Sequence, residues 1–88
     1  MASIVTYDVA EKDLELKNSM LTLGYKDHIS GDACKVIYFP STTLYHPTKT
    51  TEQVRDEIQA TCEKLSIHLL RCVATAWEDW SAICGKEF

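Results

Sequence analysis

The spacing of apolar residues along the chain switches between a period of two and a period near 3.6, and each switch predicts a change of element. Ser3–Val9 is short, β-branched and aromatic, which is typical of a strand. Ile4 lies on one face of this strand, whereas Val5, Tyr7 and Val9 lie on the other. Because both faces carry apolar residues, we expect a central strand that is covered at least partly on each side.

A first helix is expected from Asp13 to Leu23, with Asp13 as its N-cap and Gly24 at the first position beyond its end. Leu16, Met20 and Leu23 recur at helical spacing and are expected in the core. Leu14 and Leu21 lie on the opposite side, which hints at a second apolar edge that is exposed or faces a partner.

The middle of the chain predicts two antiparallel strands, Cys34–Phe39 and Thr42–Tyr45. Pro40 separates them, since proline cannot donate a hydrogen bond within a sheet. An alternative is that Tyr25–Ile29 begins the second strand and that the residues after it are inserted.

The second helix, Thr51–Leu65, has the clearest amphipathic pattern in the chain. Thr50 and Gln53 have the spacing of a capping box at its start. Its expected core stripe is Val54, Ile58, Cys62 and Leu65.

Ile67–Ala76 returns to strand character, with Leu69 and Val73 expected on one face. A short fifth strand could follow at Ser81–Cys84. The order of elements predicts an α+β fold of the ferredoxin-like βαββαβ kind, with two helices on one face of a four-stranded antiparallel sheet. We expect residues 1–88 to form a single domain.

Composition narrows the class of protein. A hydrophobic fraction of 45% and a charged fraction of 25% are those of a folded globular protein. The chain has no apolar run of membrane-spanning length and no signal-peptide pattern, so a cytoplasmic location without membrane contact is expected. A net charge of -4 with scattered basic residues disfavours a dedicated nucleic-acid partner.

Four cysteines are many for a chain of this length, but none forms a zinc-binding pair. We expect reduced, mostly buried thiols, with a disulfide framework as the alternative. The cysteines are Cys34, Cys62, Cys72 and Cys84.

The candidate chemical groups are few. Asp8 ends the first strand at the sheet rim, where it could share a hard cation with a second carboxylate, or simply cap the next turn. His46 precedes a helix N-terminus, which would disfavour its protonated form, and no spacing ties it to a nucleophile. Trp77 and Trp80 could stack bases, although packing or a protein interface is favoured.

The Tyr-Asp-Val ending at Asp8, the chain length and the order of elements resemble the CRISPR-associated Cas-two endoribonuclease family. Two further segments resemble uncharacterised relatives of that family: the stretch that begins at Ser41, and the pair Asp79-Trp80. VapD-type ribonuclease toxins share the scaffold of the family. The resemblance implies a homodimer in which two Asp8 carboxylates hold one Mg²⁺ at the dimer seam, with Ser41 close by. It thus implies Asp8 and Ser41 as catalytic residues of a metal-dependent nuclease.

Two departures from the family weigh against the activity. The stretch Val36–Pro40 lacks the basic residue that typically precedes the serine, and the whole chain is acidic. We therefore expect a small dimeric protein associated with nucleic-acid processing, with a non-catalytic protein-interaction or scaffold module as the alternative.

Overall fold

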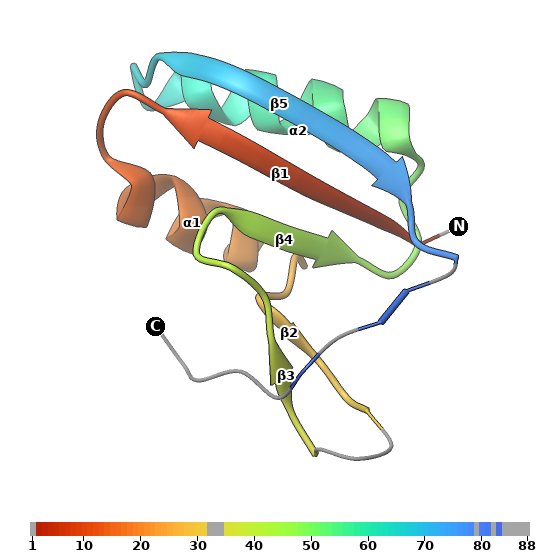
Figure 1. The fold of residues 1–88 in the computed structure, drawn as a ribbon. Coiled ribbons are helices and arrows are strands. Elements are labelled where there is room, and N and C mark those ends of the chain that lie inside the picture. Colours follow the sequence, from red (N-terminus) through yellow and green to blue (C-terminus); the bar gives the residue numbers. More distant parts are fainter. Residues whose placement is uncertain (1, 32–34, 79, 82, 84–88) are drawn as a thin grey trace.

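We describe a computed structural model of the chain, for residues 2–31, 35–78, 80, 81 and 83. It has an α+β fold with two helices, as expected from the sequence (Figure 1). The elements in chain order are β1 (Ser3–Val9), α1 (Asp13–Thr22), β2 (His28–Ile29), β3 (Ile37–Tyr38), β4 (Thr43–His46), α2 (Thr51–Lys64) and β5 (Leu69–Ala76). Among the described residues, no helix has both the length and the apolar character needed to cross a membrane.

β1 is the central strand of a three-stranded antiparallel sheet with the order β4-β1-β5. Val5, in the middle of β1, lies opposite Leu44 on one side and Ala74 on the other. β2 and β3 form a separate two-stranded hairpin, which projects from the β4 side of the molecule (Figure 1). The expected central position of Ser3–Val9 is confirmed.

The second strand was placed wrongly in the main prediction. Of Cys34–Phe39, only β3 is a strand among the described residues, and Cys34 lies outside them. The alternative that starts at Tyr25 is nearer, because Lys26 and Tyr45 exchange two backbone hydrogen bonds of 2.8 and 2.9 Å. After this single bridge the chain leaves the sheet and pairs within the β2–β3 hairpin instead.

Both helices pack on one face of the sheet, which places the core between them and β1 (Figure 1). The core prediction is confirmed for most residues and wrong for Leu23, which is 44% exposed because it caps α1 where the chain turns away. Leu65, at the end of α2, is only half-buried. The confirmed core residues are Leu16, Met20, Val54, Ile58 and Cys62.

A bulge in β5 changes which face its first residues occupy. The register between β1 and β5 shifts after Asp8, which leaves Leu70 without an opposite residue and 59% exposed. Leu69 packs against the core as a result, so its predicted placement on the same face as Val73 was wrong. Ser81 and Ile83 are not in a strand, and the other residues of the expected fifth strand lie outside the described chain.

Both helices end in the same backbone motif. At α1, Gly24 has a φ of 99°, and the N–H groups of Gly24 and Tyr25 donate to the carbonyls of Leu21 and Met20. Ser66 holds the corresponding position after α2 with a φ of 57°. The start of α2 has the predicted capping box, but the N-cap of α1 is Lys12 rather than Asp13.

We predict that Ser66→Gly stabilises the protein. A non-glycine residue in the left-handed region crowds its own Cβ, and glycine removes this cost, so the free energy of unfolding should rise by about 0.5–1 kcal/mol. Urea unfolding measures the change. Ser66→Ala is the control and should bring no gain, because alanine keeps the Cβ; equal stability of the two variants would contradict the argument.

Candidate functional site

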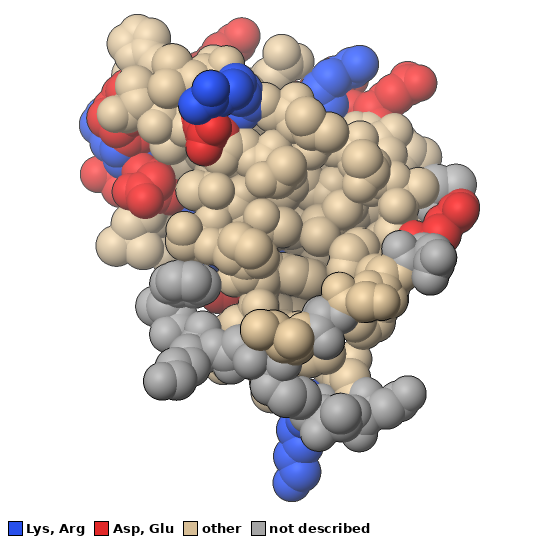
Figure 2. Space-filling model, in the orientation of Figure 1, with Lys and Arg blue, Asp and Glu red and all other residues tan. Residues whose placement is uncertain are grey.

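The sheet face that points away from the helices is open, and its composition follows from the register. Directly opposite residues share a face in an antiparallel sheet, so Ile4, Thr6 and Asp8 of β1 define this surface. Figure 2 shows that uncharged side chains fill the middle of this view and that charged ones gather toward its upper edge. We call it the open face; it consists of Ile4, Thr6, Asp8, Thr43, Tyr45, Arg71, Val73 and Thr75.

Asp8 and Arg71 are the charged residues that β1, β4 and β5 contribute to the open face, and they neutralise each other; Lys26, opposite Tyr45, adds a base at the β4 edge. The Nε of Arg71 donates to Oδ2 of Asp8 at 2.8 Å, with both side chains well exposed. The guanidinium already engages Oδ2 and repels a second cation, and one carboxylate supplies too few oxygen ligands for Mg²⁺. Among the described residues, no group of three or more His, Cys, Asp or Glu side chains could hold a metal. The described residues of one chain therefore do not fit the Mg²⁺ site that the family resemblance implies.

Ser41 lies at the same end of the sheet as Asp8. The N–H of Tyr7 donates to the carbonyl of Thr42 at 3.1 Å, which places the chain neighbours of both predicted residues side by side. Ser41 is exposed in the turn before β4, and within the described part of the chain no hydrogen bond joins it to Asp8. The two residues thus share a region without forming a catalytic pair.

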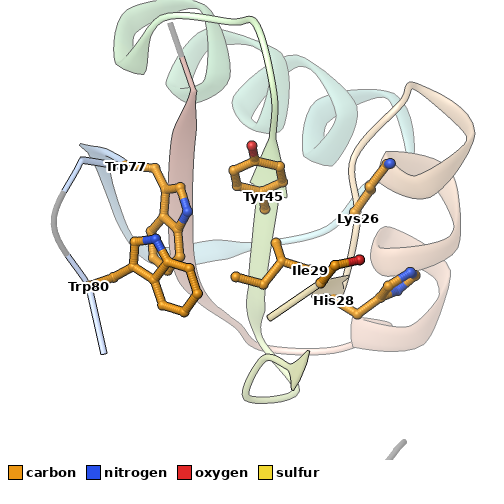
Figure 3. A pocket seen from close by; sticks show the side chains of 7 residues that line it. Lys26, His28, Ile29, Tyr45, Trp77 and Trp80 are labelled. Atoms are coloured by element: carbon orange, nitrogen blue, oxygen red, sulfur yellow. The ribbon is translucent and has the colours of Figure 1, made fainter. Parts of the chain in front are cut away.

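An aromatic cluster covers the opposite end of the open face. Trp77 and Trp80 are stacked, with ring centroids 5.1 Å apart and an interplanar angle of 20°. Trp77 also meets Phe39 and Tyr45 edge-on, at 5.7 and 6.0 Å. The stacked indoles border a hollow of about 370 Å³, whose other wall is formed by the segment from Lys26 to Ser30 (Figure 3).

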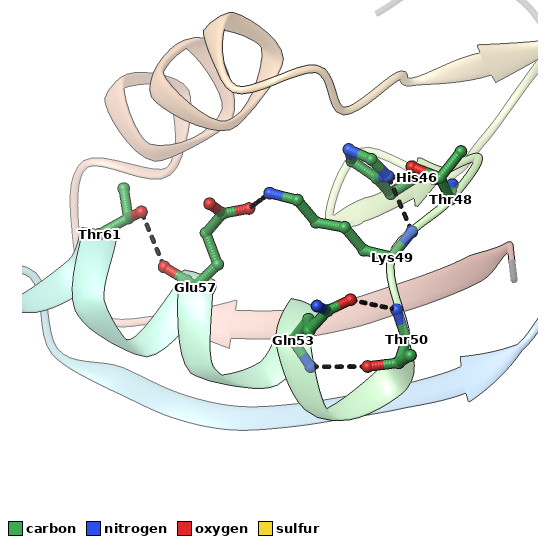
Figure 4. A network of polar contacts seen from close by, with 7 residues as sticks. All are labelled: His46, Thr48, Lys49, Thr50, Gln53, Glu57 and Thr61. Carbon is green, nitrogen blue, oxygen red and sulfur yellow. Dashed lines mark hydrogen bonds and ion pairs between the residues drawn. The ribbon is translucent and has the colours of Figure 1, made fainter.

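His46 is the centre of a polar network at the start of α2 rather than a catalytic base. Its Nδ1 accepts hydrogen bonds from the backbone N–H groups of Thr48 and Lys49, both at 3.2 Å (Figure 4). Burial, and then the nearby Lys49, lowers the pKa of His46. The lowered pKa agrees with the sequence prediction, but its main cause is burial rather than the helix N-terminus. Lys49 in turn forms an ion pair with Glu57, which keeps the pKa of that carboxyl low.

The thiols that the structure describes are poor nucleophiles. Cys62 and Cys72 are both free, and burial raises the pKa of each. A raised thiol pKa leaves little thiolate near neutral pH. Cys34 and Cys84 lie outside the described residues, so the disulfide alternative is tested only for the other two.

The sequence suggested Tyr45 as a neighbour of the two tryptophans, which the contact between Tyr45 and Trp77 confirms, but it did not suggest Phe39 or Lys26. Lys26 and Tyr45 meet through one isolated bridge, which has no periodic signature in the sequence. The available signal was the alternative strand that starts at Tyr25, because it would have placed Lys26 beside Tyr45.

Comparison with protein-family models, curated proteins and solved structures finds no match. The site is therefore interpreted from its own chemistry.

We predict that His46 makes stability dependent on pH. Its folded pKa lies below the unfolded value of about 6.5, so its stabilising contribution is complete above that pH and is lost as the pH falls toward the folded pKa. Melting temperature should therefore decrease between about pH 7.5 and about pH 5.5, a range above the carboxylate titrations. Differential scanning calorimetry measures this slope.

His46→Asn should flatten the slope, because the amide oxygen can still accept the backbone N–H groups and does not titrate. His68→Asn is the matched control, since His68 is an exposed imidazole outside this network. An unchanged slope in His46→Asn would contradict the assignment.

Proposed function

We propose that the protein is a non-catalytic, self-associating scaffold module in which the open face packs against the same face of a second copy. The observation that carries the proposal is a sheet whose helices cover only one side. On the uncovered side, the side chain of Val73 is 58% exposed. It lies opposite Thr6, in the middle of the sheet. A sheet face of this kind is commonly buried by a second layer.

The finer fold that accompanies this proposal is ferredoxin-like. The order β4-β1-β5 and the two helices on one face support it. In this proposal the Lys26–Tyr45 bridge stands in the place of the fourth strand, next to β4. The residues that follow Lys26 pair within the β2–β3 hairpin instead of continuing along β4.

Charge supports a second copy as the occupant. The chain carries a net charge of -4, yet the three strands give the open face one acid and one base that neutralise each other, with Lys26 as a further base at the β4 edge. Two such faces can meet without net repulsion, and a two-fold axis would bring Asp8 of one copy toward Arg71 of the other. A basic partner would find no excess negative charge on this face.

The nuclease of the family resemblance is the second candidate, favoured by the position of Asp8 on the open face. Two copies packed through this face could bring two Asp8 carboxylates together. The ion pair with Arg71 weighs against it, because the positive charge of the guanidinium beside Asp8 would repel a cation.

We expect a dimer at tens of micromolar by light scattering, and we expect Val73→Asp to convert it to a monomer. The new carboxylates would lie unpaired in the interface, which is costly. Leu14→Asp is the matched control: Leu14 is 66% exposed on α1, on the helix side of the molecule, and its variant should remain dimeric.

A wild-type monomer at this concentration would overturn the self-association. Melting with and without millimolar Mg²⁺ separates the two candidates. Stabilisation of the wild type but not of Asp8→Asn would favour the nuclease, whereas a dimer indifferent to Mg²⁺ supports the scaffold.

A further inference from the structure

The hollow beside the tryptophans has the size and the walls of a small-ligand site. Its volume of about 370 Å³ falls in the range of ligand pockets. The indoles of Trp77 and Trp80 form one wall, Tyr45 and Ile29 lie in the middle, and Lys26 and His28 are on the far side (Figure 3). Of the described lining residues only Tyr45 also belongs to the open face, so the hollow borders the proposed interface at its β4 edge.

The aromatic wall is held in place before any ligand arrives. The N–H of Trp77 donates to the carbonyl of Ala2 at 3.0 Å, which extends the pairing of β1 and β5 by one step. The ring of Trp77 is wedged between Phe39 and Tyr45, and Trp80 stacks on it while remaining 39% exposed. A rigid, partly exposed indole is a platform on which another planar ring can stack.

The charges around the hollow indicate which sign of charge a ligand would carry. Lys26 is exposed and, within the described residues, forms no ion pair. The nearest acid in the chain, Asp27, is already engaged by Lys17 at 3.2 Å and by His28 at 2.9 Å. Among the described residues, the lining contains a lysine and no carboxylate, which disfavours a cationic ligand and favours an anionic one.

We propose that this hollow binds a small planar aromatic ligand that carries an anionic group. The ring stacks on Trp80 and the anion lies toward Lys26. A mononucleotide has this chemistry, with a flat base and a phosphate at a short distance from it. The proposal concerns ligand binding rather than self-association and involves no chemical step.

Tryptophan fluorescence reports directly on this site, because the sequence has two tryptophans and both line the hollow. Adenosine monophosphate is the probe, and tryptophan fluorescence, excited at the red edge where adenine does not absorb, is the readout. We expect saturable quenching by the nucleotide, weaker binding of adenosine and no quenching by inorganic phosphate. No quenching by millimolar nucleotide, or equal binding of adenosine, would overturn the proposal. A single-stranded oligonucleotide that binds where the mononucleotide does not would also overturn it.

Variants separate the two parts of the site, with calorimetry as the measurement that does not need the indoles. Lys26→Gln should weaken nucleotide binding about three- to fivefold and leave adenosine unchanged, as for an exposed charge contact. Lys64→Gln is the matched control, since Lys64 is an exposed lysine that does not line this hollow, and it should bind as the wild type does. Equal losses in the two variants would show only a general charge effect and would overturn the role of Lys26.

The ring platform is tested at Trp80. Trp80→Leu should weaken binding of both nucleotide and nucleoside about tenfold, because it removes the ring on which the base stacks. Trp80→Phe should recover much of this loss, since it restores a flat ring. Recovery with phenylalanine distinguishes stacking from simple filling of the hollow, and equal binding by the two variants would overturn the stacking role.

Discussion

The pairing of β1 along both of its edges is the constraint on which the rest of the structure depends. Because β4 and β5 both take their register from β1, one alternation of side chains divides the whole sheet into two faces. Val5 and Tyr7 point into the core with both helices, whereas Thr6 and Asp8 point to the open face. A shift of β1 by one residue would exchange these two sets, so the core and the open face are fixed together.

Local patterns in the sequence predicted the elements whose signals are local. The capping box at Thr50 and the stripe through Ile58 specify α2 within one stretch of chain, and both were predicted. The second strand and the bulge at Leu70 were not, because each depends on a partner that is distant in sequence. A period of two cannot show where a register shift occurs, and therefore Leu69 was assigned to the wrong face.

The candidate sites were predictable only in part for the same reason, because their contacts join residues that are distant in sequence. The sequence singled out Asp8 and Trp80 as single residues of suggestive chemistry, but their neighbours decide what they can do. Arg71 is far from Asp8 along the chain and becomes its partner only through the antiparallel register of β5. Lys26 reaches the side of the tryptophans because the turn after Gly24 directs the chain to the edge of β4. Neither pairing has a signature in the order of residues.

The bulge in β5 also bears on how the molecule avoids uncontrolled polymerisation. Within the described residues β5 pairs with β1 alone, so its other edge has backbone groups that a foreign strand could recruit. The extra residue at Leu70 interrupts the regular spacing of those groups and increases the local twist, and Arg71 places a charge beside the interruption. A strand that docked along this edge would find regular spacing only from Arg71 to Ala76 and would lose its ladder at the bulge. The bulge thus shortens the edge that is open to fibre-like growth along the longest strand of the fold.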